Sequence, residues 1–96
     1  MLHLIYQAPL QNAVLERISP SDDVVFLENA VLGLLHKGKL SYALASLGED
    51  CQLFVLANEL KARGLLANEL VFGITPINNR QLVELTVKNK TIQTWS

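Results

Sequence analysis

The sequence predicts an α/β fold: a small three-layer sandwich around a mostly parallel five-stranded sheet, of flavodoxin-like type. Short apolar runs alternate along the chain with segments of helical spacing, an order typical of βαβ units. Half of the residues are apolar and only 18% are charged, which suits a sheet covered on both faces. The length of 96 residues indicates one domain, residues 1–96.

The expected strands are short and apolar. Residues 24–27, VVFL, form a continuous apolar run between Asp23 and Glu28, as is typical of a strand buried on both faces. The final run, TIQTW, alternates apolar and polar residues, which indicates an edge strand. The five expected strands are residues 2–6, 24–27, 51–56, 70–74 and 91–95.

Turn formers and capping residues delimit the helices between these strands. Pro9 suits the first turn of a helix, and Asn58 is a candidate N-cap. Gly38 and Gly64 stand where helices are expected to end, and Gly48 indicates a turn after a short helix. The expected helical segments are residues 10–18, 28–38, 40–48, 58–64 and 78–90.

Composition and missing motifs exclude several classes of function. The net charge is −1 and no basic block is present, so direct contact with nucleic acid is not predicted. The chain has no dinucleotide-binding or P-loop glycine pattern, and its two histidines and one cysteine lack metal-ligand spacing. The start of the chain does not resemble a signal peptide, and no run is long enough to span a membrane. We expect a cytoplasmic protein without cofactor or metal.

Polar residues at the carboxyl ends of the strands are the first site candidates, because ligands of open α/β sheets collect there. Glu28 and Asn29 follow the second strand and could orient a ligand, or cap the next helix. Lys61 and Arg63 precede Gly64, and form either a solvated face or a partner contact.

The histidines and large aromatic residues have mainly structural interpretations. His3 lies in the first strand and is expected to be a hydrogen-bonded core or interface residue. His36 is expected to complement the dipole of a helix C-terminus. Tyr42 and Trp95 are anchors, either for packing or for an interface.

Cys51 is the only cysteine and therefore the only candidate thiol nucleophile. It opens the third strand, so it should lie at the amino edge of the sheet, opposite the edge where sites form. Glu49 and Asp50 directly precede it, and negative charge raises a thiol pKa. The structural interpretation of Cys51 is therefore preferred to the catalytic one.

Several segments together resemble the DsrH/TusB family, whose members are subunits of sulfur-relay complexes. The matching segments are MLHLIYQAP, VVFLENAV, LFVLANELKARGL and LVELTVKNKTIQTWS, and they extend from residue 1 to residue 96. The resemblance implies a DsrEFH-like fold and a role in passing persulfide sulfur toward 2-thiolation of the tRNA wobble uridine. It also implies assembly with TusC-like and TusD-like paralogues in a heterohexamer that serves a downstream sulfur-acceptor protein.

The resemblance also bears on the cysteine. In the paralogous subunit that carries the persulfide, the reactive cysteine ends the equivalent strand, and this position is Leu56 here. Some relatives carry a cysteine on the first helix, but residues 10–19 contain none. The resemblance thus implies a non-catalytic subunit, with no catalytic, cofactor-binding or metal-binding residue of its own. Its candidate interface residues are Val31, Leu34, Leu35 and Trp95.

Three alternatives remain open from the sequence. The chain could be a free-standing DsrE-like sulfur carrier that uses Cys51. It could be a DsrH-type subunit in sulfur oxidation. It could also be a self-associating binding module that holds a small ligand near Glu28 and Asn58.

Overall fold

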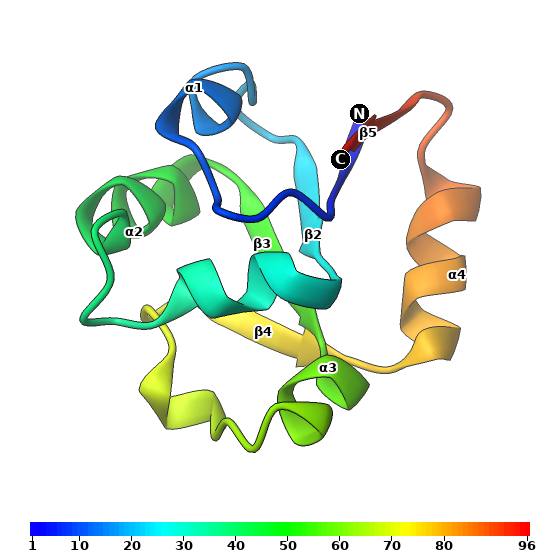
Figure 1. Ribbon diagram of the computed structural model, residues 1–96. Coiled ribbons are helices and arrows are strands. Elements are labelled where there is room, and N and C mark those ends of the chain that lie inside the picture. The colour runs from blue at the N-terminus through cyan, green and yellow to red at the C-terminus, as the bar shows by residue number, and fades with distance from the viewer.

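The computed structural model describes all 96 residues and confirms the α/β fold. Five strands form one sheet in the order β4-β3-β2-β1-β5, and every neighbouring pair is parallel (Figure 1). The strands are β1 (Leu2–Ile5), β2 (Asp23–Phe26), β3 (Gln52–Leu56), β4 (Ile74–Ile77) and β5 (Ile92–Trp95).

Helices cover the two faces of the sheet unequally. Four of the five that connect β1 through β4 contribute buried residues to the core on one face, whereas α4 stands alone on the other (Figure 1). The helices are α1 (Asn12–Leu15), the 3-10 helix η1 (Glu28–Leu34), α2 (Ser41–Asp50), α3 (Ala57–Ala62), the 3-10 helix η2 (Ala67–Glu69) and α4 (Asn79–Lys88). None is long and apolar enough to cross a membrane.

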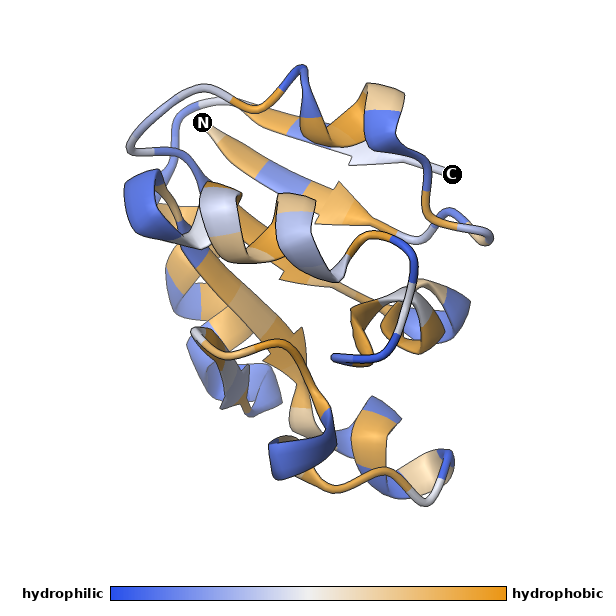
Figure 2. Cartoon of the chain, turned by 90° about the vertical axis from the view of Figure 1, so that its left-hand side faces the viewer, coloured by the Kyte–Doolittle hydropathy of each residue, from blue (hydrophilic) through white to orange (hydrophobic).

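The hydrophobic core follows this unequal cover. On the face of α1, η1, α2 and α3, 17 buried residues form one cluster around Ile5, Phe26 and Leu34. On the face of α4, only five buried residues form a second cluster, and no residue of α4 itself is buried. The inner strands are mostly hydrophobic, whereas β5, which ends at the C-terminus, is largely pale (Figure 2).

The fourth strand lies further along the chain than the sequence predicted. Leu70 and Val71 were expected in the strand, but Val71 donates its N–H to the Leu34 carbonyl of η1 at 2.8 Å. A turn at Gly73, with φ of 98°, then directs the chain into the sheet. Pro76 lies within β4, which is an edge strand and can accommodate its missing N–H.

The helix expected over residues 28–38 is instead η1, which ends at Leu34. Leu35 leaves it in extended conformation and forms an isolated antiparallel bridge with Leu70. His36 is therefore not in a helix, and the helix-dipole interpretation is wrong. Its backbone N–H and its Nδ1 lie 3.0 and 2.9 Å from the Glu69 carbonyl oxygen.

Two other helices differ in length from the prediction. The first is only four residues long and begins at Asn12, so Pro9 lies before it and not in its first turn. In contrast, α2 runs through Gly48 to Asp50 without the expected turn. The Cβ that an alanine would place at Gly48 meets only a side-chain atom, at 3.5 Å, so this glycine is not required by a turn.

The residues at the ends of α3 and α4 show which of the expected helix-capping positions are present. Asn78 caps α4, and its side chain accepts a hydrogen bond from the Gln81 N–H at 2.8 Å. Gly64 has the expected left-handed conformation after α3, with φ of 66°. Asn58, however, is not an N-cap, because α3 begins at Ala57 directly after β3 and Leu56 stands at the cap.

Candidate functional site

The carboxyl edge of the sheet brings together polar residues from the ends of β2 and β3. Arg63, at the end of α3, donates one hydrogen bond to Asn29 Oδ1 at 2.8 Å and another to Glu59. Asn29 therefore ties η1 to α3, and it does not cap η1, whose N-cap is Leu27. Glu28 beside it is exposed and has a left-handed backbone with φ of 52°.

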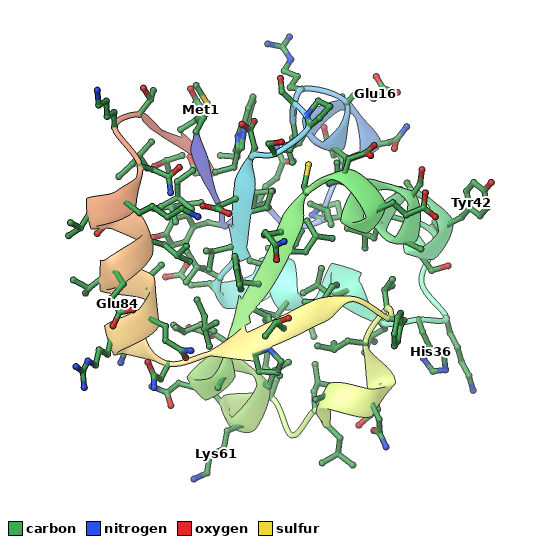
Figure 3. All side chains as sticks on the ribbon, turned by 180° about the vertical axis from the view of Figure 1, so that it is seen from behind. Met1, Glu16, His36, Tyr42, Lys61 and Glu84 are labelled. Atoms are coloured by element: carbon green, nitrogen blue, oxygen red, sulfur yellow. The ribbon has the colours of Figure 1, made fainter.

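Arg63 is thus neither a solvated cation nor a free anion-binding group. Its side chain is half-buried and its guanidinium is paired with a carboxylate one helical turn away. Lys61, by contrast, points away from the body of the protein (Figure 3). The structure brings Asn29, Glu59 and Arg63 into one hydrogen-bonded cluster, but Asn58 and Lys61 remain outside it.

Leu56 occupies the last position of β3 at this same edge. Its side chain is only 8% exposed and packs in the smaller core cluster with Val25 and Ile77. A leucine offers neither a nucleophile nor a proton, so the end of this strand supplies no reactive group. The polar residues at the carboxyl edge join η1 to α3. The residues named here do not pair a nucleophile with a general base.

Cys51 lies at the opposite, amino edge, as predicted. It is 6% exposed, and its Sγ donates to the Ser19 carbonyl oxygen at 3.2 Å. Burial raises the pKa of this thiol, and the charges of Asp22 and Asp50 raise it further against two backbone hydrogen bonds that lower it. The predicted direction is confirmed, but burial is the main cause and Asp22 is a contributor that the sequence did not indicate.

The folded protein should therefore protect Cys51 from alkylation. At pH 7.5 iodoacetamide should modify Cys51 at least about tenfold more slowly than it modifies free glutathione, because only an exposed thiolate reacts. Mass spectrometry over time gives the rate, and the same chain unfolded in urea is the control. Equal rates in the folded and unfolded chain would contradict the buried, protonated thiol.

A second network at the amino edge joins His3 to the end of the chain. The His3 side chain is 2% exposed, with Nε2 at 2.8 Å from Asp22 Oδ2 and Nδ1 at 3.1 Å from the Trp95 Nε1. His3 is thus a core histidine whose two ring nitrogens both have partners. The sequence placed His3 and Trp95 in strands, but only the parallel pairing of β1 with β5 brings the two rings together.

No three side chains of histidine, cysteine, aspartate or glutamate lie close enough together to hold a metal ion. A surface groove of about 240 Å³ lies beside α4 and is lined partly by Phe54, Leu85 and Lys88. It lies over the thinly covered face of the sheet, away from both Cys51 and the Arg63 cluster.

Comparison with known proteins assigns this fold and sequence to a family. The family model described as "DsrH like protein" matches residues 6–92. The chain belongs to the DsrH family. The resemblance carried by the segments quoted above is therefore confirmed over nearly the whole chain.

Curated relatives of this DsrH-family chain carry the name "Protein TusB". The one from Cronobacter sakazakii is 30% identical over 99% of this chain and the whole of the relative. The one from Erwinia tasmaniensis is 31% identical with the same coverage. The one from Shigella flexneri is 26% identical, again over 99% of this chain and its own full length.

A solved structure has the same fold. It is that of MTH1491, a protein of unknown function from Methanobacterium thermoautotrophicum, which superimposes with a TM-score of 0.73. The match covers 97% of this chain and 95% of the other at 15% sequence identity. It supports the three-layer α/β fold of the DsrH-family chain and nothing further.

The expected interface residues of the DsrH-family chain do not all reach the surface. Val31 and Leu34 are fully buried in the larger core cluster, so their assignment to an interface is wrong. Leu35 and Trp95 are half-buried and pack against that cluster. The apolar residues that do reach the surface include Tyr42 on α2, which projects outward (Figure 3), Phe72 before β4, and Val83 and Val87 on α4.

Proposed function

We propose that this chain is a non-catalytic subunit of a sulfurtransferase complex. The complex passes persulfide sulfur toward 2-thiolation of the tRNA wobble uridine, and the chain assembles in it with TusC-like and TusD-like paralogues. Membership of the DsrH family and the TusB relatives support this role. The chain would act in the cytoplasm and would not itself contact nucleic acid.

The observation that carries the non-catalytic assignment is Leu56. The family resemblance implies that a persulfide-bearing paralogue has its cysteine at the end of this strand, and here a buried leucine fills that place. The one thiol of the chain is at the other edge of the sheet. It is hydrogen-bonded to Ser19, and burial raises its pKa, which favours the protonated form. A buried thiol with a raised pKa is a poor acceptor of sulfur.

Exposed apolar side chains support a role in assembly. Phe72 is 97% exposed and Val87 is 81% exposed, and each would lose contact with water in an interface. The face under α4 also leaves Phe54 half-buried in the groove beside the helix. A subunit that buries such surface against paralogues can position a neighbour's persulfide without chemistry of its own.

Reconstitution of the complex tests this function. Replacing Cys51 by serine should leave the rate of sulfur transfer to the acceptor protein unchanged within about twofold, whereas omission of the chain should abolish transfer. Transfer is measured with labelled sulfur, and Cys51→Ala is the matched control for loss of the thiol hydrogen bond. The tagged chain should also co-purify with two related chains.

Two outcomes would reject the proposal. If Cys51→Ser and Cys51→Ala both assemble normally but stop transfer, Cys51 is a sulfur carrier. A mass increase of one sulfur atom on Cys51 after incubation with a persulfide donor would support the same conclusion. If the chain co-purifies with no paralogue, it is not a subunit of such a complex.

A further inference from the structure

The two hydrogen bonds of the His3 ring define its protonation. An indole N–H can only donate, so His3 Nδ1, at 3.1 Å from Trp95 Nε1, must present its lone pair. The proton of the neutral ring is then on Nε2, which donates it to Asp22 Oδ2 at 2.8 Å. His3 is therefore a neutral imidazole that accepts on one side and donates on the other.

The charged groups nearest to this ring are the Asp22 carboxylate, which contacts it, and the terminal ammonium of Met1, which contacts Asp22. Asp22, in the turn before β2, accepts from His3, from the Ser19 N–H at 3.0 Å and from the terminal ammonium of Met1 at 3.3 Å. The neighbouring Asp23 belongs to a different set of contacts, because it pairs with Lys88 at 3.2 Å. Trp95 of β5 brings no charge, and the thiol of Cys51 is bonded to Ser19.

The contacts of Asp22 favour its ionised form. Burial raises the pKa of this carboxyl, but the hydrogen bonds from His3 and Ser19 and the Met1 ammonium together lower it below its usual value. A carboxylate at this place can accept from Nε2 whether or not Nδ1 carries a second proton. Protonation therefore leaves the Asp22 bond in place and affects the Trp95 bond alone.

The Trp95 side chain is the main side-chain anchor of β5. The other three residues of this strand are exposed, and the strand has β1 as its only neighbour in the sheet. The backbone pairing of β5 with β1 is short. Its last hydrogen bond runs from the Tyr6 N–H to the Trp95 carbonyl at 2.8 Å. Loss of the Trp95 side-chain contact would therefore free the end of β5 before any other strand.

We propose that His3 is a proton-operated latch that holds β5 and its Trp95 against β1. A proton added at Nδ1 makes that nitrogen a donor, so two N–H groups face each other and the indole must leave. The released form binds one more proton at this ring than the latched form. Release is therefore favoured as the pH falls.

Tryptophan fluorescence tests the latch directly, because Trp95 is the only tryptophan. On acidification from about pH 8 to pH 5, the emission should shift to longer wavelength and quenching by acrylamide should increase about twofold. His3→Gln should keep both hydrogen bonds through its amide but lose the transition. His36→Gln, which removes the other histidine, should titrate like the unmodified chain.

A second measurement keeps the test decisive if His3→Gln does not fold. In the unmodified chain, amide exchange in β5 and the indole N–H resonance of Trp95 should show release on acidification, while β1 to β4 stay protected. The latch is rejected if the emission does not shift, if His3→Gln titrates like the unmodified chain, or if β5 and the indole N–H are unaffected by pH. It is also rejected if all strands lose protection together.

Discussion

Replacing Leu34 by alanine should lower the free energy of unfolding by about 3 kcal/mol. Leu34 is fully buried at the end of η1, within the 17-residue cluster, and its removal leaves a cavity next to well-packed neighbours. Its carbonyl also accepts the Val71 N–H, so η1 and the segment before β4 are joined at this residue. Urea denaturation measured by circular dichroism gives the value.

Leu32 provides the matched control, because it lies in the same helix and is 52% exposed. Leu32→Ala should change the free energy of unfolding by less than about 0.5 kcal/mol. Leu34 was a candidate interface residue from sequence, so the pair separates the two interpretations. Should Leu34→Ala weaken only assembly and leave unfolding unaltered, its burial in the core would be contradicted.

Replacing Asp22 by asparagine should lower the free energy of unfolding by about 2 kcal/mol at pH 7, because the carboxylate accepts from His3, Ser19 and the Met1 ammonium. The native pKa of Asp22 lies below its unfolded value. The stabilisation is thus fully present above the ordinary aspartate pKa, near pH 4, and is lost as the pH falls through the native pKa.

The difference between the two chains should accordingly narrow as the pH falls below about 4. Urea titrations at a series of pH values measure it. Glu49→Gln is the control, since Glu49 is exposed and its loss should have little effect at any pH. A gap between Asp22→Asn and the unmodified chain that is constant from neutral to acid pH would show that the carboxylate charge does not matter.

The sequence predicted those parts of the fold that depend on local signals. The apolar run 24–27 indicated a strand buried on both faces, and all of β2 is buried. A helix was expected over residues 78–90, and α4 begins within that range, where Asn78 and Gln81 form both hydrogen bonds of a capping box. The position of Cys51 at the amino edge followed from the parallel order of the strands.

What the sequence could not show depends on contacts between distant segments. The apolar run 70–74 satisfies the pattern of a strand, yet Val71 donates its N–H to the Leu34 carbonyl of η1, and Leu70 forms a bridge with Leu35. The bond between Arg63 and Asn29 joins residues 34 apart in sequence, and that between His3 and Trp95 joins residues 92 apart. Neither pair leaves a periodic signal that a single sequence could reveal.

The unequal cover of the two sheet faces has a consequence for the order of folding during synthesis. All 17 residues of the larger cluster lie between Ile5 and Ile74, so this core can form before residues 78–96 leave the ribosome. The C-terminal segment then adds α4 to the second face and inserts β5 beside β1. The contact between Trp95 and His3 therefore needs a segment that the larger cluster does not need, and this segment adds β5 to the edge of the sheet beside β1.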